Sequence, residues 1–219
     1  MVKTIGIVGY RSLDGMLFGV GNGYLEWVSR FGKPRILMPA EELADIDLLL
    51  LPGGPDMAPQ SFGATPTFRT TVPDVFRQFF FEKRLASYIN AGIPVFGICL
   101  GFQMLAVHFG STLQQHLHRH PQNAVHEVPG HIVEPLPAAA RYGTRPFEVN
   151  SSHHQGVISG DLSAELEALA LAKYGPTSDD MIVEAFRHCH KPVMAVQWHP
   201  ENWLDSFAEA MISDLLANP

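Results

Sequence analysis

The chain has 219 residues, of which 46% are hydrophobic and 17% are charged. This composition supplies enough apolar surface for a sizeable core and argues against a disordered chain. The formal net charge is −7 at pH 7. That charge argues against a protein that binds nucleic acid or an anionic membrane surface, because both partners require a basic face.

The cysteine count and the N-terminal sequence indicate where the protein works. Two cysteines are too few for a disulfide framework, so a reducing compartment is the simpler interpretation. The N-terminal stretch has no long apolar segment and does not predict a signal peptide. No apolar run reaches the roughly 18 residues that suggest a membrane span. We therefore expect a cytoplasmic protein without a membrane-spanning segment.

The first half of the chain alternates short apolar runs with helical patterns. Residues 47–51 are nearly all leucine, as expected of a parallel strand that is buried on both faces. Residues 52–72 are rich in proline and glycine and predict a long loop, a kind of segment that is often functional. Strands that alternate with helices indicate a parallel sheet. The expected strands are residues 3–9, 35–38, 47–51 and 95–99, and the expected helices are residues 22–31, 73–90 and 100–109.

The second half contains short strand candidates, most of which have no helix between them. This pattern favours antiparallel pairing, and a final amphipathic helix is expected over residues 202–216. The sequence therefore predicts one α/β domain over residues 1–219, with a central, mostly parallel sheet flanked by helices and a small antiparallel layer. The expected strands of this half are residues 112–116, 131–133, 147–150, 168–172, 182–186 and 193–197.

A cysteine at the end of an apolar strand is the most informative feature of the sequence. The strand ends at Cys99, and a turn that contains glycine leads directly into a predicted helix. This pattern is typical of a nucleophile elbow, a sharp strand-to-helix turn that lifts one side chain out of a sheet. The helix dipole and the free N–H groups of the first turn favour the thiolate. Cys99 is therefore the candidate nucleophile.

His199 is the candidate base, and Glu201 is the candidate carboxylate that orients it. A predicted strand leads into His199, and Pro200 ends that strand. Residues two apart in an extended segment point to the same side, so the Glu201 carboxylate can hydrogen-bond the imidazole. Together with Cys99, these residues fit a nucleophile–base–orienter triad, whose order along the chain is not fixed.

Acyl transfer also needs N–H groups that stabilise the developing oxyanion. One candidate is the N–H of Leu100, directly after the nucleophile, and the other is the N–H of Gly54, three residues after the end of a buried strand. The carboxyl ends of parallel strands meet at one edge of a doubly wound sheet. Gly53 at that edge permits close approach of the backbone to a substrate.

Each of these features has an ordinary structural explanation when it stands alone. A Gly-x-Cys-x-Gly run is often a buried strand end, a His-Pro-Glu segment is often a surface turn, and a Gly-Gly pair is usually part of a loop. Their joint occurrence in this order, at corresponding strand ends, favours the catalytic interpretation.

Several segments resemble known signatures. Residues 51–54 (Leu-Pro-Gly-Gly), 97–103 (Gly-Ile-Cys-Leu-Gly-Phe-Gln) and 197–201 (Gln-Trp-His-Pro-Glu) resemble those of class I glutamine amidotransferase domains. Residues 51–63 and 149–155, with residues 180–185 after them, are similar to the γ-glutamyl hydrolase branch, peptidase family C26. That branch includes the hydrolase that cleaves γ-glutamyl-γ-aminobutyrate. The resemblance spans about residues 3–205.

The resemblance implies a flavodoxin-like core and a Cys99–His199–Glu201 triad. Attack of Cys99 on a γ-glutamyl amide carbon would form a thioester and release an amine or ammonia, and water would then hydrolyse the thioester. This chemistry calls for no cofactor.

The resemblance also points to residues that would contact the substrate. Gln103 matches a family position near the glutamyl moiety, and Gly53 lies in the first signature. His153, His154 and Gln155 lie beside the active site in the hydrolase branch, without a definite role.

The sequence departs from the γ-aminobutyrate hydrolases at two places. Those enzymes often carry arginine directly after the nucleophile, where this chain has Leu100, as in the true amidotransferases. In the helix before the elbow they usually carry Arg-Asp, where this chain has Arg77-Gln78. The identity of the leaving amine therefore stays open.

Three histidines outside these signatures raise the question of a metal site. His116, His118 and His120 alternate and would share one face of a strand. Metal ligation needs converging ligands with further support, whereas residues 114–123 are polar and fit an exposed edge or loop. No metal site is expected.

Three functions are compatible with the sequence. The leading one is cysteine-dependent hydrolysis of glutamine or of a γ-glutamyl amine. A second is a glutaminase that delivers ammonia to a synthase on a separate chain, which Leu100 favours. A third is an inactive homologue that serves as a binding or regulatory module, against which the intact set of triad residues argues. Homodimerisation is compatible with each.

Overall fold

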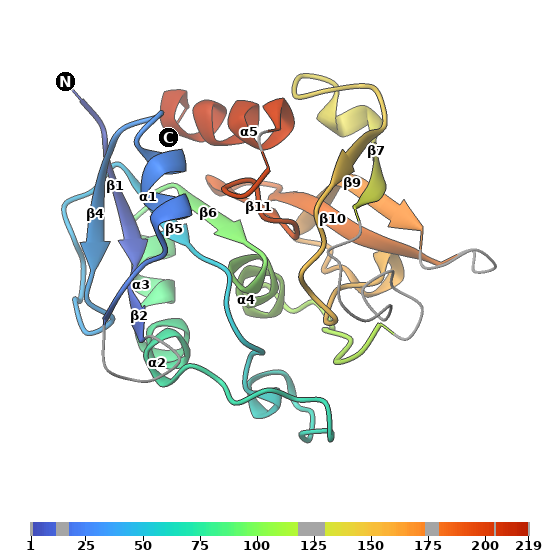
Figure 1. Ribbon diagram of the computed structural model, residues 1–219, viewed down its shortest axis with the longest axis horizontal. Helices are drawn as coiled ribbons and strands as arrows, with labels where there is room; N and C mark the ends of the chain where they lie inside the picture. The colour runs from blue at the N-terminus through green and yellow to red at the C-terminus, as the bar shows by residue number, and fades with distance from the viewer. Residues whose placement is uncertain (1, 12–17, 118–129, 174–179, 204, 219) are drawn as a thin grey trace.

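The computed structural model describes residues 2–11, 18–117, 130–173, 180–203 and 205–218. Within these residues, nine strands form one sheet in the order β4-β1-β5-β6-β11-β10-β9-β7-β8 (Figure 1). The strands of the sheet are β1 (Thr4–Val8), β4 (Lys33–Leu37), β5 (Leu48–Leu51), β6 (Val95–Ile98), β7 (His131–Pro135), β8 (Phe147–Val149), β9 (Leu166–Lys173), β10 (Met181–His188) and β11 (Val193–Val196).

The sheet has a parallel part and an antiparallel part. Strands β4, β1, β5, β6 and β11 run parallel. Numbered among themselves by chain order, they follow 2-1-3-4-5, which is the flavodoxin-like order. Strands β10, β9, β7 and β8 pair antiparallel and continue the same sheet. The predicted α/β fold with a mostly parallel core is thus confirmed, and its antiparallel part extends the sheet.

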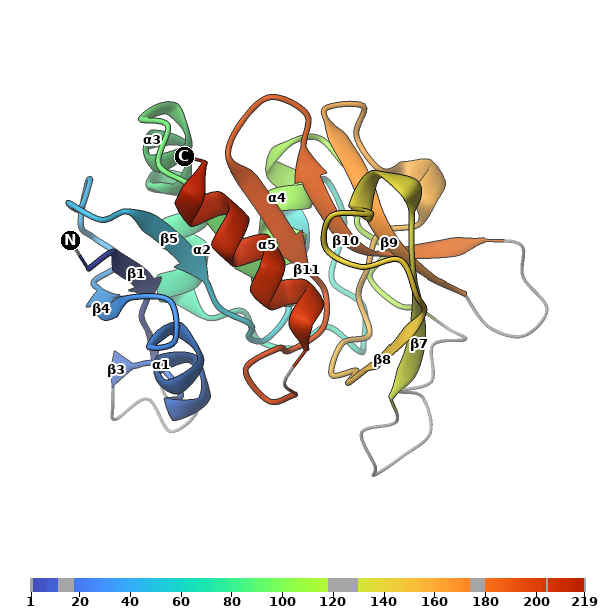
Figure 2. The same cartoon turned by 90° about the horizontal axis from the view of Figure 1, so that it is seen from above.

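Helices cover both faces of the parallel strands, as Figure 2 shows from above. Leu48 and Leu50 belong to a core cluster that includes side chains of α1 and α5. Leu49 and Leu51 belong to a second cluster that includes side chains of α2, α3 and α4. All four leucines are buried, and each full burial is worth about 1.5–3 kcal/mol. The helices are α1 (Asn22–Val28), α2 (Val75–Lys83), α3 (Leu85–Asn90), α4 (Leu100–His108) and α5 (Ser206–Ala217).

Shorter elements complete the described part of the chain. Strands β2 (Tyr10–Arg11) and β3 (Phe18–Gly19) form a separate two-stranded sheet. Three single turns of 3-10 helix are η1 (Pro59–Phe62), η3 (Pro137–Ala139) and η4 (Ser159–Asp161). Among the described residues, no helix combines the length and the hydropathy that crossing a bilayer requires.

One predicted helix is divided in two, and one predicted strand is not formed. The helix expected over residues 73–90 is two helices, because Arg84 leaves helical geometry with φ −126° and ends α2 before α3 begins. The strand expected over residues 112–116 is wrong. Only Gln114 forms an isolated bridge, because the backbone N–H groups of Thr112 and Leu117 donate to the carbonyls of Asp161 in η4 and His154 in a loop, and not to a strand.

The last helix begins four residues later than expected. Asp205 caps α5 by accepting a hydrogen bond from the N–H of Ala208 at 2.7 Å, as a helix N-cap requires. The indole N–H of Trp198 donates to the same carboxylate at 2.8 Å. Residues 201–203 therefore continue the turn that follows β11 and stay outside the helix.

Register brings three distant segments to one edge of the sheet. Strand β6 lies between β5 and β11, and its pairs include Gly97 with Leu51 and Ile98 with Val196. Because all three strands run parallel, the segments that follow them leave the sheet at the same edge. Gly53-Gly54, Cys99 and His199 lie in those segments.

Candidate active site

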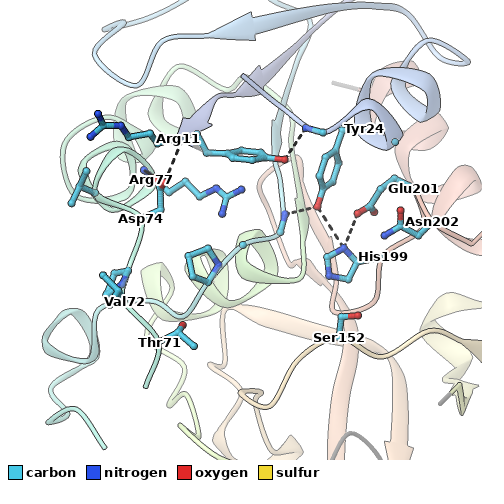
Figure 3. Close-up of a pocket in the computed structure, with 18 residues that line it drawn as sticks. Arg11, Tyr24, Thr71, Val72, Asp74, Arg77, Ser152, His199, Glu201 and Asn202 are labelled. Carbon is cyan, nitrogen blue, oxygen red and sulfur yellow. Dashed lines mark hydrogen bonds and ion pairs between the residues drawn. The ribbon is translucent and has the colours of Figure 1, made fainter. Parts of the chain in front are cut away.

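A cleft of about 910 Å³ opens at this edge of the sheet (Figure 3). Its walls come from the β2 strand, the start of α1, the loop after β5, the start of α2 and the turn after β11. Figure 3 shows Arg77 and Asp74 on one side of the cleft and His199, Glu201 and Ser152 on the other. Gly53 and Gly54 line the cleft.

Cys99 occupies the sharp turn between β6 and α4. Its backbone has φ 51° and ψ −102°, and it is the one residue other than glycine with a positive φ in the described part of the chain. Such strain is costly and persists only where the surroundings enforce it. The Cys99 N–H donates to the Val196 carbonyl at 3.0 Å, and the Cys99 carbonyl accepts from the Gln103 N–H at 3.1 Å. These bonds hold the elbow to the sheet and to α4.

A glycine two residues after the nucleophile permits the close packing of this turn. A methyl group on Gly101 would overlap the carbonyl oxygen of Leu51. The first turn of α4 therefore lies directly against β5. Cys99 itself is only 4% exposed, so the nucleophile lies beneath the floor of the cleft.

His199 is anchored by two different groups. Its Nδ1 lies 2.7 Å from Glu201 Oε1. Its backbone N–H donates to Asn150 Oδ1 at 2.9 Å, and its carbonyl accepts from Asn150 Nδ2 at 2.7 Å. Since Glu201 binds Nδ1, Nε2 is the ring nitrogen left for Cys99. The arrangement fixes both the position and the tautomer of the imidazole.

The imidazole and the nucleophile share the space beside Gly53. A methyl group built on Gly53 would lie 2.5 Å from His199 Cε1 and 3.2 Å from Cys99 Cβ. Burial by itself lowers the pKa of His199. The thiolate of Cys99 and the carboxylate of Glu201 outweigh burial and raise the pKa of His199 to about 10. His199 is thus held as an imidazolium at neutral pH, directly beside the nucleophile.

Tyr24 is a site residue that the sequence did not identify. Its hydroxyl accepts a hydrogen bond from the Gly53 N–H at 2.9 Å and lies 3.5 Å from His199 Nδ1. Burial, together with the charges of Glu201 and Cys99, raises the pKa of Tyr24 well above its usual value near 10. A neutral phenol therefore links the Gly53 loop to the His199–Glu201 pair.

The two residues expected to bind an oxyanion lie close together. Leu100 is the first residue of α4, so its N–H has no acceptor within the helix. A methyl group on Gly54 would lie 3.1 Å from Leu100 Cδ2. The neighbouring Gly53 N–H is already bound to Tyr24, so the N–H groups of Gly54 and Leu100 stay the candidates for this role.

Most of the residues expected to contact substrate do not line the cleft. Gln103 Nε2 donates to the Gln155 carbonyl at 3.2 Å, and His153 Nδ1 lies 2.9 Å from that same oxygen. All three side chains are buried. His154 is half-buried and places Nε2 3.0 Å from Asp56 Oδ1. Of the five residues expected to contact substrate, Gly53 alone is among the described residues that line the cleft.

A second buried carboxylate lies beyond His153. Glu184 is fully buried, 3.2 Å from His131 Nε2 and 3.9 Å from His153 Nε2. Burial lowers the pKa of His131, but Glu184 outweighs it and raises that pKa above 6.5. No role was predicted for this group, although Glu184 lies in the segment 180–185.

The histidines considered for metal binding are described only in part. His116 Nε2 accepts a hydrogen bond from Arg69 Nη1 at 2.6 Å, and its Nδ1 lies 3.5 Å from His154 Nδ1. His118 and His120 lie outside the described residues. Within the ranges that the structure covers, no group of three or more histidine, cysteine or acidic side chains could hold a metal ion.

Comparison with known proteins gives consistent matches. The model of the peptidase C26 family matches residues 20–201. YvdE of Lactococcus lactis, a glutamine amidotransferase-like protein, is 29% identical over 212 residues, with 89% of this chain and 86% of that protein covered. A component of the glutamine-hydrolysing GMP synthase of Methanospirillum hungatei is 28% identical over 175 residues, with 80% and 84% covered.

The fold also matches solved structures. A GMP synthase component from Thermoplasma acidophilum has a TM-score of 0.69 at 18% identity. The match covers 99% of this chain and 94% of that one. At this identity the likeness shows a shared fold.

Proposed function

Because the chain belongs to the peptidase C26 family of glutamine amidotransferase-like proteins, we propose that it hydrolyses γ-glutamyl amide bonds through Cys99. One observation carries the proposal. Cys99 stands on a strained elbow beside an imidazole that Glu201 orients at 2.7 Å. That is the arrangement of an activated nucleophile with its base and orienting carboxylate.

In the first step, the thiolate of Cys99 attacks the amide carbon of the γ-glutamyl group. The carbonyl electron pair moves to oxygen, and the N–H groups of Gly54 and Leu100 stabilise the oxyanion. Collapse of this intermediate breaks the C–N bond, and the imidazolium of His199 gives its proton to the leaving nitrogen. The products are a thioester on Cys99 and a free amine or ammonia.

In the second step, water hydrolyses the thioester. Neutral His199 takes a proton from water, the hydroxide attacks the thioester carbon, and the C–S bond breaks. The new γ-carboxyl group loses its proton to solvent, glutamate leaves, and His199 and Cys99 return to the ion pair. Glu201 stays ionised and stabilises the imidazolium in both steps.

Release of glutamate from a panel of γ-glutamyl compounds tests this proposal. L-Glutamine and a series of γ-glutamyl amines are incubated with the full chain, and glutamate, ammonia and amine are quantified. Intact-protein mass spectrometry after rapid quenching is expected to show the glutamyl adduct on the peptide that contains Cys99. No glutamate from any member of the panel would contradict the proposal.

A second candidate is ammonia supply to a synthase on another chain. It is supported by the similarity to a component of a glutamine-hydrolysing GMP synthase and by leucine at position 100. In that case, glutamine is the preferred substrate, and its hydrolysis accelerates when the ammonia-using chain from the same organism is added. A preference for substituted γ-glutamyl amines, with no response to such chains, excludes this candidate.

The pH dependence of the reaction is expected to reflect His199. His199 must be protonated to protonate the leaving amine, so kcat/KM is expected to be lost as pH rises through about 10. In Glu201→Gln, we expect this alkaline limb to move to lower pH, because a carboxylate that favours the imidazolium is removed. Profiles of both proteins with one substrate give the measurement, with folding checked by circular dichroism at each pH. An alkaline limb at the same pH in both would contradict the assignment.

A further inference from the structure

Arg77 places a buried cation in the wall of the cleft. It extends from the first turn of α2, and its Cζ lies 3.8 Å from the centre of the Tyr10 ring. The residue is only 5% exposed, yet it lines the cleft (Figure 3). Stacking on an aromatic face fixes the plane of a guanidinium and stabilises its charge. The guanidinium is therefore held in place before any ligand arrives.

No carboxylate of the described residues forms an ion pair with this guanidinium, and its buried Nε has no hydrogen-bond partner. Asp74 is the acidic side chain that most favours the charge, but its oxygens are used elsewhere. Oδ1 accepts from the N–H groups of Phe76 and Arg77, and Oδ2 accepts from the Arg11 N–H. Burial lowers the pKa of Arg77, as expected of a cation that lacks a bound anion.

The guanidinium lies beside the proposed oxyanion site and away from His199. A methyl group on Gly54 would overlap Arg77 Nη1, whereas one on Gly53 would lie 2.5 Å from His199 Cε1. Figure 3 shows Arg77 and His199 on opposite sides of the cleft. A substrate whose carbonyl is held at Gly54 therefore has His199 on one side and the guanidinium on the other.

From this arrangement we propose that Arg77 binds a carboxylate of the substrate and selects anionic γ-glutamyl compounds. The inference rests on the proposed hydrolysis and extends it to substrate recognition. A guanidinium offers two parallel N–H groups to a carboxylate, which gives both affinity and a fixed orientation. The leaving amine must lie beside His199, so the bound carboxylate belongs to the acyl half, as the α-carboxylate of the γ-glutamyl group does.

Substitution of Arg77 tests the proposal. Arg77→Met keeps a long apolar side chain against Tyr10 and removes the charge. We expect kcat/KM of the best substrate to fall about a hundredfold, mainly through KM, because one partner of a buried charge pair is lost. For the α-carboxamide analogue of that substrate, kcat/KM should fall little in Arg77→Met. Arg77→Lys keeps the charge without the planar fork and should recover part of the loss.

Lys83→Gln is the matched control. It removes an exposed positive charge from the same helix, α2, away from the cleft, and should leave both kinetic constants unchanged. If Lys83→Gln lowers kcat/KM as much as Arg77→Met does, the effect comes from the overall electrostatic field of the protein, and the proposal is overturned.

Paired substrates identify which carboxylate is bound. γ-Glutamyl-γ-aminobutyrate and γ-glutamyl-n-butylamide share the α-carboxylate, and only the first carries one on the leaving amine. Loss with both substrates in Arg77→Met supports binding of the α-carboxylate, whereas loss with the first alone would overturn that assignment, because Arg77 would then bind the carboxylate of the leaving amine. An equal fall in kcat for every compound, including the α-carboxamide analogue, would overturn the proposal, since Arg77 would then act on Cys99 or the oxyanion.

Ligand binding separates this inference from the proposed reaction. Calorimetry with Cys99→Ala and with Cys99→Ala/Arg77→Met compares L-glutamine, L-glutaminamide and γ-glutamyl-γ-aminobutyrate without turnover. Weaker binding of the carboxylate-bearing ligands to the double variant alone supports the role of Arg77. Equal binding to both variants, or no binding to either, overturns it. If the unmodified chain hydrolyses nothing, the proposed reaction is wrong, and this comparison still decides the role of Arg77.

Discussion

Cys99→Ala is expected to lower kcat/KM for every γ-glutamyl substrate by roughly 10⁵- to 10⁶-fold, the loss typical of removing a nucleophile that acts with its base. Alanine keeps the Cβ atom, so the strain at φ 51° is unchanged and the elbow should fold as before. Glutamate release gives the rate, and mass spectrometry of the quenched protein should show no glutamyl adduct.

The second cysteine provides the control. Cys189 is exposed, and its Sγ makes only a weak 3.9 Å contact with the Ala164 carbonyl. Cys189→Ala should retain full activity and the glutamyl adduct. If Cys99→Ala keeps the activity of the unmodified chain, the proposed mechanism is wrong. That result would instead indicate that this protein acts without a covalent intermediate.

Much of the fold could be predicted because a strand that is buried on both faces has a simple sequence pattern, a continuous run of apolar residues. The leucines of β5 alternate between two core clusters, as expected of a strand with helices on both faces, which needs apolar residues at every position. No sequence pattern predicts the break at Arg84, since Lys83 and Leu85 are good helix formers. Gln114 finds its partner at Gly156, a pairing that depends on the folded loop and not on local pattern.

The candidate site likewise contains residues that could be predicted from the sequence and residues that only the structure revealed. Cys99, His199 and Glu201 were predicted from rules that act over a few residues: a strand end, a turn and a two-residue spacing. Tyr24 and His199 are 175 positions apart, and Asn150 and His199 are 49 apart. The helical pattern of residues 22–31 explains Tyr24 as a core residue, which it also is. Only the sheet order brings such groups together, so their roles became visible in the structure.

The stacking of Arg77 on Tyr10 is another feature that could not be predicted from the sequence. Arg77 was named from the sequence only as part of the Arg77-Gln78 pair, in which Gln78 stands where the γ-aminobutyrate hydrolases usually carry aspartate. Its burial depends on β2, a two-residue strand that periodicity does not detect. A short strand beside α2 converts an ordinary helix arginine into a fixed cation next to Gly54.

Gly53→Ala is expected to lower kcat/KM about a hundredfold, because a misplacement of about 1 Å in a catalytic group costs that much. The new methyl group would lie 2.5 Å from His199 Cε1, 2.9 Å from the Tyr24 hydroxyl and 3.2 Å from Cys99 Cβ. The imidazole has to move away from the nucleophile to make room. Kinetics with the best substrate give the size of the loss, and urea unfolding gives its cost in stability, about 1–3 kcal/mol for overpacking a buried site.

The pH profile distinguishes displacement of His199 from simple loss of folded protein. When His199 moves away from Cys99, it loses part of the interaction with the Cys99 sulfur that helps to raise its pKa to about 10. The alkaline limb of kcat/KM in Gly53→Ala should therefore move toward lower pH, which partial unfolding would not cause. Gly160→Ala is the matched control, because a methyl group there meets no atom within 4 Å, and it should leave rate and profile unchanged. Full activity of Gly53→Ala with an unmoved limb would mean that His199 and Cys99 do not share the space beside Gly53 during the reaction.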